Sequence, residues 1–316
     1  MRALIAVLTF FCVFPALQAQ NLVRGSYSLK VEELRSESAL QLTLSDVAGR
    51  ILYQVNRELA YDTPRPAVHL YADGSVLIVD SFAGVYEYYG TSGQMVRRVP
   101  FNEEIRANHE RITFVSGNDS TAAVLTSEPG VSESRILVLD RAGTVRFDRP
   151  FEGTFASGLL LSPNGELIAG GTYRWIGASL AFNTEFLTIA GTSVTGLGHE
   201  FKGGSWSPDG TLFVVYGRER ASLINVMKRE IISTSLLGEN RIVHDVFWDG
   251  SIPYVASSPV PKMRSGTWMY EGLVVLNLSD GRTAYQSAEV SFKSAKLEST
   301  VGGVSAKIDG QSIRIR

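Results

Sequence analysis

Short apolar runs separated by turn residues dominate the chain from about residue 40 to its end. The clearest runs span residues 76–79, 136–139, 212–215 and 273–276. They are rich in β-branched and aromatic side chains and are too short for most helices, so they predict β-strands. Gly, Asp, Asn and Pro interrupt the pattern about every 8–12 residues, which indicates a β-sandwich, a barrel or a propeller.

Two kinds of turn alternate along the chain and favour the propeller. A first-type turn has an acidic or amide residue beside Gly, and these residues are Asp73, Asn118, Asn164, Asp209, Asp249 and Asp309, at spacings of 45, 46, 45, 40 and 60. A second-type turn, centred on Gly49, Gly93, Gly143, Gly191 or Gly281, or on Lys228 and Arg229, lies between them. Two hairpins, hence four strands, in about 40–50 residues make one propeller blade.

The two ends of the chain each carry one kind of turn only. Residues 40–53 hold a second-type turn, and residues 304–315 hold a first-type turn. We therefore expect these half-blades to pair, which gives an all-β, six-bladed β-propeller closed by N- and C-terminal strands in one blade. Such pairing removes an open blade edge. Seven blades are the alternative if the pattern hides a further pair of turns.

Residues 1–19 have the pattern of a secretory signal peptide. Arg2 precedes an apolar run over residues 3–17, and Ala19 offers a small residue at a cleavage point. A membrane anchor is the alternative, but the run is short of the ~20 apolar residues of a bilayer span. Cleavage would remove the only cysteine, Cys12, and leave residues 20–316 as a single propeller domain without a transmembrane segment. We expect a periplasmic or secreted protein.

Composition and charge exclude several function classes. Lys+Arg number 30 and Asp+Glu 32, a formal net charge of −2, which excludes a generally basic nucleic-acid binder. One cysteine excludes a disulfide scaffold and a cysteine-based zinc site. The sequence has no His-x-x-x-His pair, no Gly-x-Ser-x-Gly elbow and no phosphate-binding glycine loop. We therefore expect no metal and no cofactor, and these absences favour a non-enzymatic protein.

Three of the turns share a longer motif. They are Ser162-Pro163-Asn164-Gly165, Trp206-Ser207-Pro208-Asp209-Gly210 and the degenerate Trp248-Asp249-Gly250. This motif resembles the aromatic-Ser-Pro-Asp-Gly repeat of TolB-like and related WD40-like propellers. The resemblance covers the propeller portion only, since the α/β domain of TolB has no counterpart here. It implies a propeller fold and an exported location, and it favours binding over chemistry.

The four histidines are the remaining candidates for chemistry: His69, His109, His199 and His244. His69 and His244 come just before first-type turns, on strands expected to be innermost in their blades. Such side chains can line a central channel, where a histidine can act as a general base or a ligand. The alternative is a hydrogen-bonded structural histidine, which the lack of an accompanying carboxylate cluster favours.

A binding surface is expected on the face that carries the connections between hairpins and between blades. The expected binding residues are Arg174, Trp175, Arg218, Arg220, Arg264, Trp268 and Tyr270. Residues 257–270 are interpreted as an insertion, because they lie between Asp249 and Asp309, whose spacing of 60 is the longest between first-type turns. Long connections on a rigid scaffold are often sites of recognition. Trp, Tyr and Arg are also the residues that dominate interface hot spots.

These observations predict an exported binding propeller that recognises a protein, peptide or glycan of the cell envelope. The alternative is a six-bladed enzyme of the lactonase or sugar-dehydrogenase kind, with a metal or quinone in its central channel. A structural role in an envelope assembly is a third hypothesis. Converging Asp, Glu, Asn or His side chains in the channel would favour the enzyme.

Overall fold

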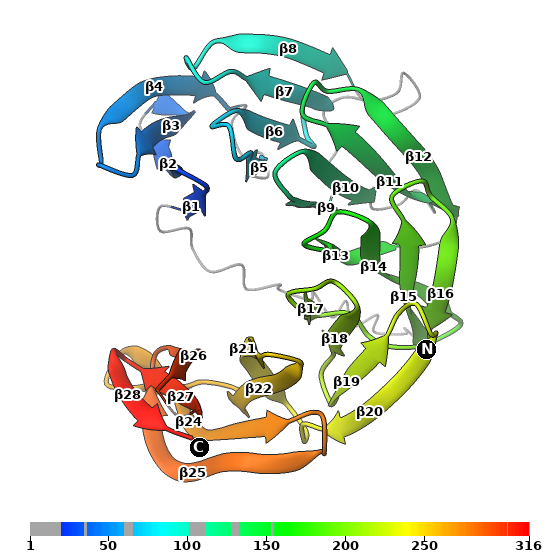
Figure 1. Cartoon of the computed structure of the whole chain (residues 1–316), viewed down its shortest axis with the longest axis vertical. Helices are drawn as coiled ribbons and strands as arrows, with labels where there is room; N and C mark the ends of the chain where they lie inside the picture. The colour runs from blue at the N-terminus through cyan, green and yellow to red at the C-terminus, as the bar shows by residue number, and fades with distance from the viewer. Residues whose placement is uncertain are drawn as a thin grey trace, which may run out of the picture.

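The strands of the protein form seven antiparallel sheets arranged in an arc (Figure 1). The computed structural model describes residues 20–34, 37–59, 66–100, 112–127, 133–152, 155–301 and 303–315. The predicted signal peptide at residues 1–19 lies outside these ranges. No helix in the described ranges is long and apolar enough to cross a membrane.

Each sheet is one blade, and the chain builds the blades one after another. Blade 1 comprises β1 (Gln20–Arg24), β2 (Tyr27–Leu34), β3 (Ala39–Asp46) and β4 (Ile51–Glu58). Blade 2 comprises β5 (Ala67–Leu70), β6 (Val76–Asp80), β7 (Val85–Tyr89) and β8 (Met95–Pro100). Blade 3 comprises β9 (Ile112–Gly117), β10 (Thr121–Ser127), β11 (Glu133–Asp140) and β12 (Val145–Glu152), and blade 4 comprises β13 (Phe155–Leu161), β14 (Leu167–Ile176), β15 (Ser179–Thr188) and β16 (Ser193–Leu197).

The last three blades differ in strand number. Blade 5 comprises β17 (Gly203–Trp206), β18 (Leu212–Tyr216), β19 (Arg220–Asn225) and β20 (Glu230–Leu236). Blade 6 comprises β21 (Arg241–Asp249), β22 (Ile252–Pro259), β23 (Lys262–Arg264), β24 (Thr267–Asn277) and β25 (Arg282–Phe292). Blade 7 comprises β26 (Ala295–Thr300), β27 (Gly303–Ile308) and β28 (Gln311–Arg314). The extra strand of blade 6, β23, pairs with the first residues of β24.

Burial follows the order of the strands within a blade. The middle strands β6 and β7 of blade 2 are buried along their whole length, whereas the outer strand β8 is mostly exposed. The middle strands have a neighbouring blade on each face, so both faces of these strands are apolar and their sequences read as continuous apolar runs. This explains why the apolar runs were so clear in the sequence.

The hydrophobic core is divided into six clusters, each between two consecutive blades. The first joins Leu42 of blade 1 to Ile78 of blade 2, and the last joins Leu273 of blade 6 to Ala306 of blade 7. The other four join blades 2 and 3, 3 and 4, 4 and 5, and 5 and 6. Within the described ranges, no such cluster joins blade 7 to blade 1. The blades are therefore held together in series.

Hydrogen bonds between innermost strands follow the same series. Each joins two neighbouring blades through a side chain of one and, in most cases, a backbone group of the other. The pairs are His69 with Asn118, Leu161 with Ser116, Trp206 with Leu160, Trp248 with Ser205, and Leu297 with Asp245. Arg24 of blade 1 reaches further and donates to the carbonyl oxygen of Gly117 in blade 3. These bonds fix the spacing of the blades around the centre of the arc.

The prediction of six blades was wrong, and the predicted closing blade made from both chain ends is not confirmed. β3 and β4, which contain the expected N-terminal half-blade, pair with β1 and β2 in a complete blade 1. β27 and β28, the expected C-terminal half-blade, pair with β26 in a separate blade 7. No pairing in the described part of the chain connects the two ends. The count is therefore seven sheets, and the alternative of seven blades is the one that the structure supports.

The error came from two turns without an acidic or amide residue. Gly25 and Ser26 connect β1 to β2, and β26 ends at Thr300, three residues before β27 begins at Gly303. Gly25 adopts a φ of 55°, a left-handed conformation that glycine reaches without strain, so this turn needs no acidic or amide residue beside the glycine. The turn at Asp309 and Gly310 connects β27 to β28, so it is the second turn of its blade and lies on the opposite face from the other first-type turns.

The Ser-Pro-Asx-Gly motif has a clear structural role. In blade 4 the buried Ser162 hydroxyl accepts a 2.9 Å hydrogen bond from the N–H of Leu167 and donates a 2.6 Å bond to Asn164. In blade 5 Ser207 makes the same bonds to Leu212 and Asp209, at 2.9 and 2.5 Å. The serine closes the turn from inside, where no water could replace it. The motif therefore stabilises the hairpin of the two innermost strands.

Candidate functional site

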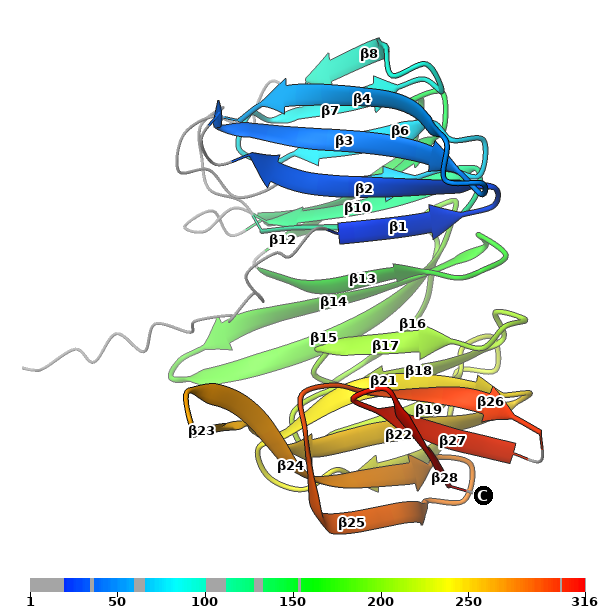
Figure 2. The ribbon, with the colours of Figure 1, turned by 90° about the vertical axis from the view of Figure 1, so that its left-hand side faces the viewer.

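The predicted binding residues lie on one face of the arc. In every four-stranded blade the first and third strand connections are on one face, and the second connection and the link to the next blade are on the other. We call these the tight-turn face and the loop face. All seven predicted residues lie on the loop face, on blades 4, 5 and 6. Among the described strands, those of the hairpins β14–β15 and β23–β24 project furthest on this face (Figure 2).

The β14–β15 hairpin carries an exposed apolar tip. Trp175 is 59% exposed, and Ile176 beside it is also exposed. Gly177, with a φ of 60°, opens a two-residue turn that reverses the chain to Ser179. Such a glycine-first turn matches the twist of the paired strands and keeps the hairpin extended. Arg174, on the same strand, is exposed and forms no ion pair within the described ranges.

The β23–β24 hairpin carries a second exposed apolar tip. Met263 and Trp268 are directly opposite each other in the strand register, and each is 59% exposed. Ser265 and Gly266 both have positive φ, 48° and 79°, which is typical of a tight hairpin turn. The predicted insertion is therefore an ordered hairpin. Lys262 and Arg264 on β23 both pair with the carboxylate of Glu271, with Lys262 Nζ 3.6 Å from Glu271 Oε2.

Blade 5 lies between these hairpins along the arc, and its arginines are engaged. Arg218 Nε is 3.2 Å from Glu200 Oε1, and Arg220 donates a 2.8 Å hydrogen bond to the carbonyl oxygen of Gly198. Both bonds tie the β18–β19 turn to the segment that links blades 4 and 5. These arginines stabilise the loop face, and their exposed edges remain accessible.

Tyr270 is half-buried and belongs to the core between blades 6 and 7. Its ring stacks on Phe292 at 5.6 Å between centroids and meets the edge of His244 at 4.4 Å. Tyr270 therefore supports the base of the β23–β24 hairpin and contributes little surface to it.

His69 and His244 both lie on innermost strands, β5 and β21, as the sequence predicted, but they do not converge. His69 Nε2 donates to the carbonyl oxygen of Asn118 at 3.0 Å, and His244 Nε2 is 2.7 Å from Ser258 Oγ. Burial lowers the pKa of each imidazole to about 4. His199 is buried in the segment that links blades 4 and 5, and His109 lies outside the described residues. Both channel candidates have the partners expected of structural histidines.

The described residues contain no group of three or more His, Cys, Asp or Glu side chains that could hold a metal ion. This finding concerns only the metal form of the lactonase or dehydrogenase alternative, and only the described residues.

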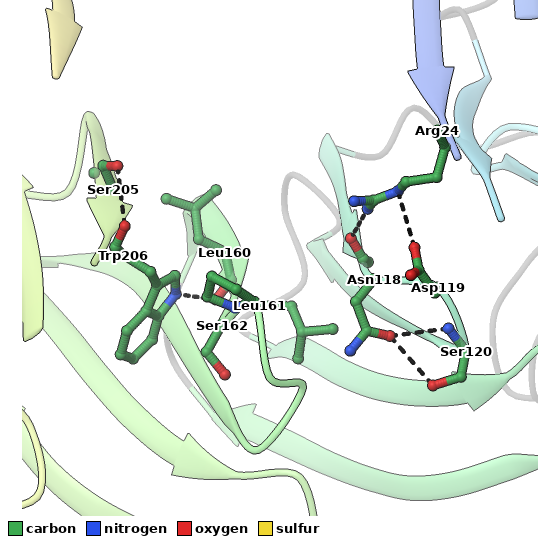
Figure 3. A pocket seen from close by; sticks show the side chains of 12 residues that line it. Arg24, Asn118, Asp119, Ser120, Leu160, Leu161, Ser162, Ser205 and Trp206 are labelled. Carbon is green, nitrogen blue, oxygen red and sulfur yellow. Dashed lines mark hydrogen bonds and ion pairs between the residues drawn. The ribbon is translucent and has the colours of Figure 1, made fainter. Parts of the chain in front are cut away.

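A pocket that the sequence did not predict opens on the tight-turn face (Figure 3). It has a volume of about 450 Å³ and lies at the inner ends of four blades. Its lining residues are Arg24 of blade 1, Gly117, Asn118, Asp119 and Ser120 of blade 3, Leu160, Leu161, Ser162 and Pro163 of blade 4, and Gly204, Ser205 and Trp206 of blade 5.

The two sides of this pocket differ in chemistry. Arg24, Asn118, Asp119 and Ser120 form one side, and Leu160 and Trp206 lie on the other (Figure 3). The Asn118 side chain is fixed, because its Oδ1 accepts bonds from the N–H groups of Ser120 and Thr121, both at 3.0 Å. Two lining residues, Ser162 and Trp206, belong to the Ser-Pro-Asx-Gly motif at the ends of innermost strands. The motif was therefore the feature of the sequence that could have indicated this pocket.

Comparisons with known proteins support the fold and no particular family. No protein-family model matches the sequence, and no curated protein matches it. Hydrazine synthase of Kuenenia stuttgartiensis is similar in structure, with a TM-score of 0.53 and 12% identity over 83% of this chain and 84% of that chain. Hsv2 of Kluyvelomyces marxianus gives a TM-score of 0.52 and 9% identity over 92% and 88%.

A computationally designed protein, Ika8, is also similar, with a TM-score of 0.51 and 10% identity over 92% of this chain and 93% of that chain. At these identities the likeness shows a shared propeller fold alone. The resemblance to TolB-like and WD40-like propellers stays a prediction from the turn motif.

Proposed function

We propose that this protein is an exported binding propeller that recognises a polypeptide partner of the cell envelope through its loop face. The observation that carries the proposal is the pair of projecting hairpins, β14–β15 and β23–β24, each with a tryptophan that is 59% exposed. A large exposed apolar side chain on an ordered hairpin costs free energy in water, so two of them on one face are typical of an interaction site.

The surroundings of the tryptophans favour a polypeptide over a glycan. Arg174 lies one residue before Trp175, and Arg264 lies across the turn from Trp268, so each tip combines an aromatic side chain with a cation. Trp and Arg together dominate the hot spots of protein interfaces. The flanking Ile176 and Met263 add aliphatic surface, which packs on protein side chains and offers nothing to sugar hydroxyls.

Site-specific photo-crosslinking tests the proposal. A photoreactive amino acid replaces Trp175 in one variant, Trp268 in a second and Met227 in a third. Met227 is 64% exposed but lies in the β19–β20 turn on the tight-turn face, so it is the matched control. We expect positions 175 and 268 to capture the same partner from envelope extracts and position 227 not to capture it.

Alanine variants provide the quantitative test. Trp268→Ala and Arg264→Ala should each weaken binding of the captured partner about tenfold or more, with little change in melting temperature because both side chains are exposed. Equal capture at all three positions, or a large loss of stability with unchanged affinity, would contradict the proposal. Binding to a glycan array that depends on Trp268 would redirect it to a sugar ligand.

A further inference from the structure

The pocket on the tight-turn face has a charge pattern that points to a particular kind of small molecule. Of its twelve lining residues, Arg24 and Asp119 are the charged ones. They have opposite signs, so the lining is neutral overall and does not favour a nucleotide or another multiply charged anion. Both charges lie on the polar side of the pocket (Figure 3).

These two charges are only loosely paired. Arg24 Nε is 3.7 Å from Asp119 Oδ1, and the side chains are 36% and 70% exposed. Arg24 is held in place independently, because its Nη2 donates to the carbonyl oxygen of Gly117. Exposed pairs of this kind are worth little, so a ligand that brings its own opposite charges can replace the pair at small cost.

The other side of the pocket is apolar and rigid. Trp206 is 7% exposed, and its Nε1 donates to the carbonyl oxygen of Leu160 at 3.3 Å. The ring of Phe213 packs against the indole at a tilted angle, with 4.7 Å between the ring centroids. The indole and the half-buried side chain of Leu160 give this side of the pocket an apolar lining. An aliphatic side chain of a ligand can pack on it.

We propose that this pocket binds a free α-amino acid with an apolar side chain. The carboxylate of the ligand binds the guanidinium of Arg24, and its ammonium group binds the carboxylate of Asp119. The apolar side chain lies towards Leu160 and Trp206. The volume of about 450 Å³ is within the range of small-molecule sites. The site is on the face opposite the projecting hairpins, so it is independent of the proposed polypeptide surface.

Isothermal titration calorimetry on the purified protein tests this inference. The probes are L-leucine, L-methionine and L-phenylalanine at up to about 10 mM. For the probe that binds best, the N-acetyl derivative lacks the ammonium charge and the amide derivative lacks the carboxylate. We expect each blocked derivative to bind about tenfold more weakly or not at all, since each leaves one charge of the pocket without its partner.

Variants connect the binding to the two charged residues. Arg24→Gln and Asp119→Asn should each reduce the affinity at least about tenfold. The matched control is Arg141→Gln, because Arg141 makes a similar loose pair with Asp73, 3.6 Å apart, between blades 2 and 3 and outside the pocket. Asp119 is well exposed, so Asp119→Asn should fold even if Arg24→Gln is destabilised.

The inference would be overturned by no heat of binding with any of the three amino acids, by equal binding of a blocked derivative, or by an equal loss of affinity in Arg141→Gln. Retained affinity in both pocket variants would place the ligand elsewhere and would also refute the assignment.

Discussion

The Nε2–H of His69 in blade 2 donates a 3.0 Å hydrogen bond to the carbonyl oxygen of Asn118 in blade 3. The imidazole also meets the edge of Tyr71, with 4.7 Å between ring centroids. The bond thus joins two blades at their innermost strands. Burial lowers the pKa of His69 to about 4, so the side chain is neutral near pH 7.

This relationship predicts a stability that depends on pH. An unfolded histidine titrates near 6.5, so between about pH 6.5 and pH 4 the unfolded chain binds a proton that the folded protein does not. The contribution of His69 is therefore complete above about pH 6.5 and is lost as the pH falls towards 4. Urea unfolding should show that His69→Gln, which keeps an N–H donor, loses about 2 kcal/mol less than the natural protein between pH 6.5 and 4.5. Parallel pH profiles would contradict this assignment.

Arg57 is expected to be the most sensitive charged residue of the fold. It is buried between blades 1 and 2, with Nε 2.5 Å from Glu87 Oε2 and Nη2 2.6 Å from Asp80 Oδ2. Arg57→Met leaves two buried carboxylates without their cation, and breaking such a pair costs about 3–5 kcal/mol. The free energy of unfolding from chemical denaturation measures the loss.

The control for Arg57 is another bidentate pair that is closer to solvent. Arg135 contacts both oxygens of Asp148 at 2.6 Å on blade 3, and both side chains are partly exposed. Arg135→Met should cost about 1 kcal/mol or less. Adding Glu87→Gln and Asp80→Asn to Arg57→Met should recover part of its loss. An equal loss in the free energy of unfolding for Arg57→Met and Arg135→Met would show that burial does not determine how much the Arg57 ion pairs stabilise the fold.

Gly191 is predicted to tolerate no side chain. Its φ is 87°, and a Cβ at this position would overlap the ring of Phe147 from blade 3. Gly191→Ala therefore combines backbone strain with overpacking, and we expect a loss of about 2–4 kcal/mol. Gly177 also has a positive φ, 60°, but open space around it, so Gly177→Ala should cost only about 1 kcal/mol.

Melting temperatures of the two glycine variants measure this difference. A second change, Phe147→Leu, should rescue Gly191→Ala in part, because it removes the ring edge that a Cβ would meet. No rescue would mean that the backbone conformation alone requires glycine at this position.

The turn pattern predicted most of the fold from residue 67 onward. The β5–β6 and β7–β8 hairpins of blade 2 begin a repeat that continues through blade 6, with the expected turn at each reversal. The prediction failed at the ends because the turn at Gly25, and the sequence between β26 and β27, have glycine without an acidic or amide neighbour. Such turns satisfy the backbone equally well, so the sequence carries no distinct signal for them.

The two candidate sites differ in how far the sequence predicts them. The loop face follows from topology, because strand order alone places Trp175 and Trp268 on one side of the arc. The pocket brings Arg24 together with Trp206, about 180 residues later, through the curvature of the arc. Turn spacing contains no information on that curvature, so the convergence becomes visible only in three dimensions.

Asp245 is predicted to hold blade 7 to blade 6. Its Oδ2 accepts a 2.7 Å hydrogen bond from the N–H of Leu297 on β26. Asp245→Ala leaves this N–H without its charged acceptor, a loss of about 1–3 kcal/mol, so amide exchange in β26 and β27 should accelerate roughly tenfold to a hundredfold. Asp245→Asn keeps an oxygen acceptor and should show a smaller effect.

The same exchange experiment distinguishes an independent blade 7 from a blade closed by the N-terminal strands. If blade 7 is a separate sheet supported by blade 6, the amides of β3 and β4 keep their protection in Asp245→Ala, because no pairing in the described ranges connects them to β27 or β28. A shared closing blade would instead loosen both hairpins together. Joint acceleration of β3, β4 and β28 would therefore restore the composite blade and refute the seven separate sheets.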